Sequence, residues 1–309
     1  MPATVEPGPD RLARRRTAGS WLYLLPAALL LTGVFAVPLA ESFVLSLQKD
    51  AGMAGTAGWA GLHNYAGELS SGVFWQVAWQ TALWTVGVVG LTLVVSFVLA
   101  SLLRSPFRGR TACRTLLMIP WASSIAVSAV VWQFGFAPNG LIDRTLQLFG
   151  LSSLIEPWLA NTPQSMVVLI LVGVWVSVPF STVMILAGMS GIPHELYDAA
   201  ALESSRALHS ERYITLPLLR HVLLIATMSN FVVVFNSFPI IYVMTGGGPI
   251  NRTNILATYL YQEAFQDLEF GHASAVAVLV SVFLLSVTFV YVRVLVHPRR
   301  RYERVAKVG

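Results

Sequence analysis

The stretch ELYDAAALESSRALHSERYITLPLLR, residues 195–220, interrupts an otherwise strongly apolar sequence. It holds four acidic residues and three arginines between two long apolar runs. The chain of 309 residues is 55% hydrophobic and only 11% charged, and its mean hydropathy is +0.67. This composition is too apolar for a soluble domain of that length. We therefore expect the charged stretch to connect two membrane spans.

Six long windows around this stretch contain no Asp, Glu, Lys or Arg. They cover residues 17–40, 69–103, 115–142, 157–194, 221–251 and 270–292. Each exceeds the roughly 20 residues that a helix needs to cross about 30 Å of hydrocarbon. Their apolar residues do not alternate with a period of two, as the strands of a membrane barrel would. The sequence predicts an all-α membrane protein with six transmembrane helices.

The windows divide the chain into a basic tail (1–20), a six-helix domain (21–296, with the charged loop at 189–220) and a second basic tail (297–309). The first window could also be a secretory signal, because Arg14, Arg15 and Arg16 precede it. Its apolar run is longer than a usual signal core, and no small-x-small cleavage site follows it. These two features favour an uncleaved span.

The basic residues are distributed very unequally between the two sides of the predicted membrane. Seventeen of the 20 lie in or next to the two tails and in the segments 104–114 and 206–220. Only Lys49, Arg144 and Arg252 lie in the other connections. The positive-inside rule therefore predicts that both termini and the charged loop are cytoplasmic. The net charge of +5 is explained by this topology, so no nucleic-acid partner is expected.

The sequence shows no motif for catalysis, nucleotide binding or metal binding. Neither Lys49 nor Lys307 completes the phosphate-binding pattern G-x-x-x-x-G-K-[ST], and Cys113 is a lone cysteine without ligand-like neighbours. We expect a non-catalytic chain with no metal and no cofactor of its own. One external glycine-rich segment is interpreted as a structural turn rather than a phosphate site; it consists of Gly246, Gly247, Gly248 and Pro249.

Two interpretations of the charged loop follow from its residues alone. The segment from Glu195 to Arg206 contains good helix formers, and Glu203 and Arg206 can pair at a spacing of three. Its small and apolar residues would let such a helix dock into a groove of a partner. Alternatively, the loop is simply solvated and its charges keep it out of the membrane.

The loop resembles the cytoplasmic signature of permeases from binding-protein-dependent ABC importers. That signature consists of E-A-A, two residues, D-G-A and, after a gap of eight residues, I-x-L-P. The corresponding positions here are Asp198, Ala199, Ala200, Glu203, Ser204, Ser205, Ile214, Leu216 and Pro217. The two acidic residues are exchanged in type, and Ser204 replaces a glycine, so Ser204 must avoid a positive φ or accept strain.

The flanking residues resemble, more narrowly, the carbohydrate-uptake permeases of the maltose and glycerol-phosphate type. LAGMSGIPHELYDAAA (186–201) follows Trp175, Pro179 and Phe180, and TGGGP (245–249) with FGHASAVAV (270–278) is similar to the maltose-transporter F-like subunit. The resemblance covers about residues 21–296. It implies a type I ABC importer fold, in which the charged loop is a coupling helix seated on an ATPase subunit.

The resemblance also implies partners, a location and site residues. The partners are a sister permease, two ATPase subunits that bind ATP and Mg²⁺, and an external solute-binding lipoprotein. The solute is a sugar or a polyol phosphate, and the location is the bacterial inner membrane. The coupling residues would be Glu195, Asp198, Ala199, Ala200, Glu203, Ser204, Arg206, Ile214 and Pro217.

The fifth predicted span combines aromatic and polar residues. Phe231, Phe235, Phe238 and Tyr242 recur at the spacing of one helical face, either to stack on a sugar or to pack on a neighbouring helix. Pro239 removes the helical partner of a carbonyl one turn earlier, which predicts a kink. Buried amides need partners, so the polar residues must face other helices or a wet path. The candidate substrate path is Asn230, Phe231, Phe235, Asn236, Ser237 and Tyr242.

Two other classes of protein compete with this interpretation. A stand-alone secondary transporter would have six spans, but it would not explain the charged loop in register with I-x-L-P. Such carriers usually bury an ionisable residue, whereas Glu41, His221 and His272 lie at span boundaries. A non-transporting membrane scaffold could use the loop merely to recruit a partner.

Overall fold

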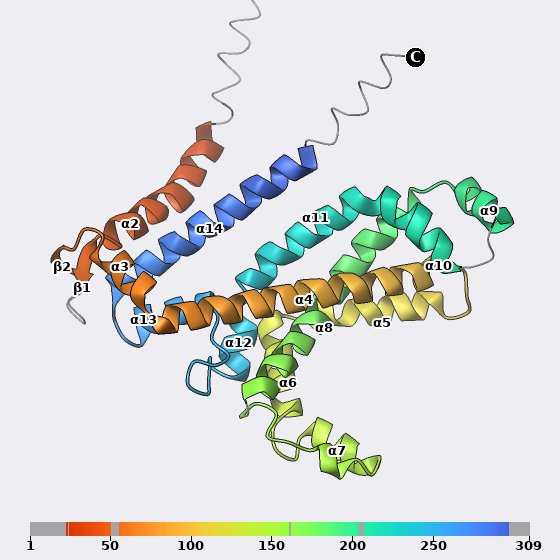
Figure 1. Ribbon diagram of the computed structural model, residues 1–309, viewed down its shortest axis with the longest axis horizontal. Coiled ribbons are helices and arrows are strands. Elements are labelled where there is room, and N and C mark those ends of the chain that lie inside the picture. Colours follow the sequence, from red (N-terminus) through yellow and green to blue (C-terminus); the bar gives the residue numbers. More distant parts are fainter. Residues whose placement is uncertain (1–22, 24, 51–55, 161, 204–206, 297–309) are drawn as a thin grey trace, which may run out of the picture.

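The computed structural model describes residues 23, 25–50, 56–160, 162–203 and 207–296 (Figure 1). Helices dominate, and a two-stranded antiparallel hairpin of β1 and β2 is added to them. The elements in chain order are η1 (Thr32–Ala36), α2 (Val37–Leu45), β1 (Gln48–Asp50), β2 (Thr56–Trp59), α3 (His63–Ser70), α4 (Gly72–Arg104), α5 (Arg110–Ala122), α6 (Ile125–Gly135), α7 (Leu141–Leu148), η3 (Ser152–Leu154), α8 (Thr162–Ser190), α9 (His194–Glu203), α10 (Ala207–Ser210), η4 (Glu211–Thr215), α11 (Leu216–Phe235), α12 (Phe238–Met244), α13 (Leu256–Phe265) and α14 (Phe270–Val296).

Five helical segments among the described residues are long and apolar enough to cross a membrane. They are Leu25–Leu45, Gly72–Arg104, Pro163–Ser190, Glu211–Phe235 and Phe270–Arg293. A sixth candidate is the pair α5 and α6, which is bent by 97°. The prediction of six membrane-crossing segments is confirmed if this pair counts as one span.

The expectation that the third span, within the window 115–142, is a single helix is wrong. Ser123 and Ser124 adopt extended backbone conformations, with ψ of 146° and 138°, so the helix ends at Ala122 and restarts at Ile125. Pro120 lies inside α5 and removes the helical donor for the Leu116 carbonyl, one turn before the break. The Ser123 hydroxyl donates to the Ile119 carbonyl at 3.1 Å, which satisfies one acceptor of the last turn.

The core of the molecule is the crossing of α4 and α8 (Figure 1). Trp84 of α4 is completely buried, and its indole N–H donates to the Val234 carbonyl of α11 at 2.8 Å. Its ring packs on Gly173 of α8, where an added Cβ would lie 2.7 Å from a ring carbon. Small residues let membrane helices approach closely enough for van der Waals packing to hold them together. Trp84 thereby joins three spans.

Helices α2 and α14 lie beside each other at the edge of the molecule, apart from the α4–α8 crossing (Figure 1). The first span has no buried residue in its most apolar window. The hairpin is attached to α14 because the Asp50 carboxylate accepts hydrogen bonds from the backbone N–H groups of Gly271 and His272. This carboxylate satisfies donors at the first turn of α14 and complements its helix dipole.

Two short helices lie in the connections between the spans. Helix α7 lies within the segment 140–158, and α13 covers the amphipathic stretch 257–265. Asn139, in the turn APNG (137–140), has a φ of 59°, a conformation that asparagine tolerates better than most residues. Helices α9 and α10 lie where α4 ends and α5 begins, away from α7 and the hairpin (Figure 1).

We expect Gly173→Ala to destabilise the protein, because its methyl group would overlap the buried Trp84 ring. Overpacking of this kind typically costs about 1–3 kcal/mol. The measurement is the thermal unfolding midpoint in detergent. Gly90→Ala on α4 is the control, since no other atom lies within 4 Å of the added carbon. Equal midpoints for the two variants would show that the close approach at Gly173 does not matter.

Candidate functional site

The charged loop forms the predicted helix α9, and the two of its acidic side chains that the structure describes are exposed. Glu195, Asp198 and Ala199 are exposed, and Ala200 is half-buried. Ser204 and Arg206 lie outside the described residues, as does the side chain of Glu203. The exposed side chains give α9 a negatively charged surface that a partner could contact.

The second half of the loop signature joins the loop to the fifth span. Ile214 is half-buried in η4, a π-helical turn, and π-turns often occur at functional positions. Pro217 is exposed and stands in the first turn of α11, where a missing backbone N–H costs nothing. The I-x-L-P residues thus start α11 directly after the turn.

The fifth span breaks in two near its proline. Helix α11 ends at Phe235, and α12 begins at Phe238 with Pro239 in its first turn. The predicted kink is therefore confirmed as a complete interruption of the helix. Asn236 and Ser237 form the connection, and Asn236 is exposed while Ser237 is buried.

The break separates the aromatic residues into two groups, so the prediction of a single stripe is wrong. Phe231 and Phe235 lie 5.7 Å apart, and Phe235 stacks on Phe283 of α14 at 5.6 Å. Beyond the break, Phe238 stacks on Tyr242 at 4.7 Å, and both contact Tyr261 of α13. The helical spacing that would align all four residues does not continue through 236–237.

The two asparagines of the candidate path differ in environment. Asn230 is buried, and its amide donates to the Ser181 hydroxyl of α8 and to the Ala226 carbonyl, both at 2.8 Å. Asn236 is exposed and donates to the Val232 carbonyl at 3.0 Å. The structure therefore gives Asn230 a role in joining α11 to α8 and leaves the Asn236 carboxamide accessible at the helix break.

The apolar side of α11 borders a cavity of about 450 Å³. Helices α4, α13 and α14 supply the other walls, and almost all the lining atoms are apolar. The lining includes Phe74, Trp75, Phe231, Phe235 and Phe283. Phe231 and Phe235 thus lie on the surface of this cavity, whereas Asn236 and Tyr242 are exposed.

The glycine-rich external segment is a tightly held turn. Gly246 and Gly247 have φ of 59° and 84°, which favour glycine. The Thr253 hydroxyl donates to the Gly248 carbonyl at 2.6 Å and pairs with the Thr245 hydroxyl at 2.8 Å. This geometry agrees with the interpretation as a structural turn, which continues through Pro249 toward α13.

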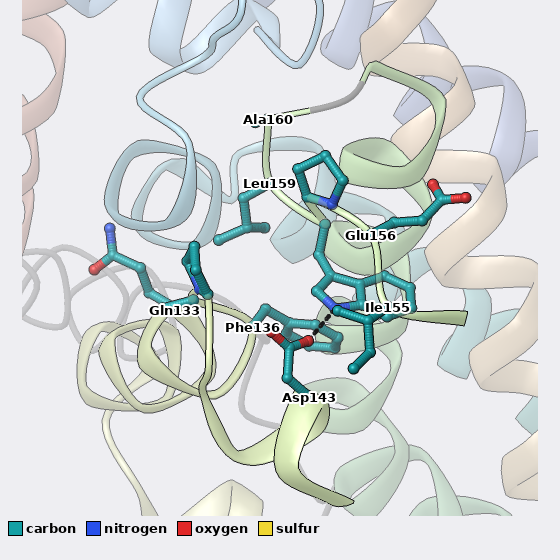
Figure 2. Close-up of a pocket in the computed structure, with 11 residues that line it drawn as sticks. Gln133, Phe136, Asp143, Ile155, Glu156, Leu159 and Ala160 are labelled. Atoms are coloured by element: carbon teal, nitrogen blue, oxygen red, sulfur yellow. Dashed lines mark hydrogen bonds between the residues drawn. The ribbon is translucent and has the colours of Figure 1, made fainter. Parts of the chain in front are cut away.

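A second cavity, of about 520 Å³, lies between α6, α7 and residues 155–160 (Figure 2). The Asp143 carboxylate accepts from the Trp158 indole N–H at 2.8 Å and from the Asn139 backbone N–H at 2.9 Å. Phe136 and Glu156 also line the cavity. No sequence pattern points to it, because the fold alone brings its three walls together.

A cluster of titratable residues joins α3, α13 and α14. The buried Glu68 carboxylate lies 2.9 Å from His272 Nδ1 and accepts from the Tyr259 hydroxyl at 3.2 Å. Burial raises the pKa of Glu263, on α13, to about 7, and the neighbouring acidic residues add to this shift. Among the described residues no group of acids, histidines and cysteine is arranged to hold a metal ion.

The helical spans, with the charged loop between the fourth and fifth of them, agree with the importer permease fold that the sequence resemblance implies. Residues 92–302 match the family described as "Binding-protein-dependent transport system inner membrane component". The chain belongs to this family.

Two relatives and one solved structure illustrate the similarity. A probable ABC transporter permease of Brucella suis is 41% identical over 75% of this chain and 80% of its own length. The trehalose/maltose transport system permease MalF of Thermococcus litoralis is 30% identical over 92% of this chain and 96% of its own. The crystal structure of a bacterial ABC transporter involved in the import of alginate has a TM-score of 0.77, with 19% identity, over 93% and 98% of the two chains. The similarity to this structure shows that the two chains share a fold.

We expect Asn230→Ala to lower the stability of the protein, because it leaves Ser181 without its partner from α11. Losing a buried hydrogen bond typically costs about 0.5–1.5 kcal/mol. Thermal unfolding in detergent measures the effect. Asn236→Ala is the matched control, since the exposed amide bonds only within its own helix, and its change should stay within about 0.5 kcal/mol. A larger loss for Asn236→Ala than for Asn230→Ala would contradict this assignment.

The raised pKa of Glu263 predicts a pH-dependent stability. Because the folded state favours the neutral acid, its contribution is complete below the usual pKa of 4.5 and is lost as the pH rises through about 7. Glu263→Gln should therefore reduce the fall in unfolding midpoint between about pH 5 and pH 8. Glu156→Gln, which changes an exposed carboxylate, should leave the pH profile unchanged; a similar change in both variants would argue against burial as the cause.

Proposed function

We propose that this chain is one of two permease subunits in an ATP-driven importer of a sugar or polyol phosphate. The observation that carries the proposal is the exposed acidic surface of α9, which stands directly between the fourth and fifth spans in a chain of this family. The relatives named above support a carbohydrate as solute, since one is named for trehalose and maltose and the neighbouring structure for alginate.

The proposed orientation places α9, α10 and both termini in the cytoplasm of a bacterium, with the chain in its inner membrane. The positive-inside rule supports this choice, because the arginine-rich connection between α4 and α5 lies at the same end as α9. The hairpin, α7 and the glycine-rich turn would then face the external solute-binding protein.

In this proposal the energy comes from two ATPase subunits, which bind ATP and Mg²⁺, and this chain itself is non-catalytic. Closure of the ATPases around ATP would carry α9 with them. The spans would change from an inward-facing to an outward-facing arrangement and receive the solute from the binding protein. A sister permease would complete the path, and α9 would contact one ATPase through Glu195 and Asp198.

The solute would pass the break between α11 and α12. Irregular backbone at membrane depth is tolerated where it lines a cavity or is covered by protein. Asn236 offers a carboxamide at this break, and Tyr242 offers an exposed aromatic ring with a hydroxyl. Sugars are commonly held by hydrogen bonds from amides together with aromatic faces. Asn236 and Tyr242 are therefore the strongest candidates for contact with the solute, and Phe235 ranks third.

The first test of this function is assembly. We expect the tagged chain, purified from its native membrane in mild detergent, to bring with it a soluble ATPase and a second permease. Mass spectrometry identifies them. A chain that emerges alone from repeated gentle preparations, and whose solute uptake survives the loss of ATP, would instead be a secondary transporter.

The second test concerns the path. In the assembled transporter, Asn236→Ala should weaken solute uptake by roughly the tenfold that corresponds to one lost hydrogen bond of about 1.4 kcal/mol. The ATPase content of the complex should not change. Ser286→Ala, which removes an exposed hydroxyl that donates to the Val282 carbonyl of its own helix α14, is the control. Unchanged uptake kinetics in the Asn236 variant would exclude it from the path.

A further inference from the structure

Arg104, the last residue of α4, contacts two segments of the charged loop that are far away in the sequence. Its guanidinium carbon lies 4.2 Å from the centre of the Tyr197 ring, and Tyr197 belongs to α9. Its Nη2 atom also lies 3.4 Å from Oε1 of Glu211, in the π-helical turn η4. One side chain therefore connects the end of the second span with both α9 and the beginning of the fifth span.

Two of these segments, α9 and η4, are joined by a second contact. The Tyr197 hydroxyl and the buried Thr215 hydroxyl lie 3.0 Å apart, and Thr215 directly precedes α11. Tyr197 thus presents its ring face to α4 and its hydroxyl to the end of η4, next to α11. A displacement of α9 cannot leave both contacts unchanged, because they fix the ring from two directions.

The Arg104–Glu211 ion pair is partly shielded from water. The side chains of Arg104 and Glu211 have relative exposures of 26% and 19%. A partly desolvated guanidinium stacked on an aromatic ring interacts more strongly than one in open water. An ion pair in the same place is less screened by salt than a surface pair. These contacts therefore differ from ordinary exposed pairs, which contribute little.

We propose that Arg104 is a positioning residue, which transmits the displacement of α9 to the second and fifth spans. The inference rests on the proposed function, because it requires an ATPase that moves α9. Arg104 itself contacts neither the ATPase nor the solute. It acts by holding Tyr197 and Glu211 in fixed positions relative to the end of α4.

The geometry of the ion pair offers two arrangements. Arg104 and Glu211 share one contact here, while Arg104 Nη1 and Glu211 Oε2 are buried and have no hydrogen-bond partner among the described residues. Guanidinium and carboxylate groups form two parallel hydrogen bonds when they approach more closely. A movement of η4 toward α4 would let Arg104 and Glu211 form the second hydrogen bond. The pair therefore favours a closer arrangement of η4 and α4, while the present arrangement keeps one of the two contacts.

The test uses the complete transporter, reconstituted in vesicles with its ATPases and binding protein. Its variants are Arg104→Gln and Glu211→Gln, singly and together. Four quantities are measured: the ATPase that co-purifies, the basal ATP hydrolysis, its stimulation by the solute-loaded binding protein, and solute uptake. Arg108→Gln is the matched control, because Arg108 is an exposed arginine four residues away in the same connection.

We expect Arg104→Gln to keep its ATPase and its basal hydrolysis but to lose roughly tenfold in stimulation and in uptake, as coupling free energies of this size imply. Glu211→Gln removes one of the two Arg104 contacts and leaves the Tyr197 stacking in place, so it should lose less, and the double variant should be no worse than Arg104→Gln. Tyr197→Phe removes only the hydroxyl contact and should give a smaller loss of the same kind. Arg108→Gln should behave like the wild type.

The outcomes separate this inference from the proposed function. If Arg104→Gln transports like Arg108→Gln, or if the losses of the two single variants add up, Arg104 does not transmit the movement. If Arg104→Gln loses the ATPase itself, the residue stabilises the docking surface and the inference is wrong. If the wild-type chain binds no ATPase, the proposed function fails first, which the co-purification reveals independently.

Discussion

The fold depends on the contact between the Trp84 indole and the bare backbone of Gly173. Within a bilayer, lipid tails are as apolar as leucine, so burying apolar side chains gives helices little reason to associate. Close van der Waals packing and hydrogen bonds between helices must replace that driving force. Trp84 supplies both, because its ring fills the space at Gly173 and its N–H reaches the Val234 carbonyl. The crossing of α4 and α8 is therefore fixed in position, and α11 is fixed to it.

Two further hydrogen bonds join α4, α8 and α11 at other points along their lengths. Ser96 of α4 donates to the Val178 carbonyl of α8 at 3.1 Å, and Asn230 of α11 donates to Ser181 of the same helix. Toward the end that carries α9, apolar side chains of α4, α8 and α11 form a separate core with Leu219 completely buried. A rigid group of three spans therefore lies between the charged loop and the helix break, and it can carry a displacement from one to the other.

Much of this fold could be predicted from the sequence, because charge-free windows and the positions of arginines report directly on membrane spans. The helix of the charged loop could also be predicted, because its good helix formers are neighbours in the sequence. The bend between α5 and α6 was not, because a window without charges says nothing about direction. Pro239 signalled the interruption of the fifth span, but the assumption of continuous helical spacing placed four aromatics on one face.

The candidate site was predictable only where its residues are neighbours in the sequence. The loop signature fixed Asp198 and Pro217 by spacing, whereas Arg104 counted merely as one basic residue among many. Its contact with Glu211 spans 107 positions, and no local pattern connects two residues so distant. Asn230 and Asn236 looked alike as amides in an apolar span, and only tertiary packing distinguishes the interhelical bond of one from the exposure of the other.

The bend of 97° between α5 and α6 has a consequence for the protein within the membrane. Backbone groups in the extended link cannot all be satisfied within their own helices, and hydrocarbon offers them no hydrogen bonds. Ser124 in this link is exposed in the single chain. At membrane depth, backbone groups without hydrogen-bond partners would be costly. A second protein surface that covers the link would remove that cost. The need to pair these backbone groups therefore favours an assembled chain over an isolated one.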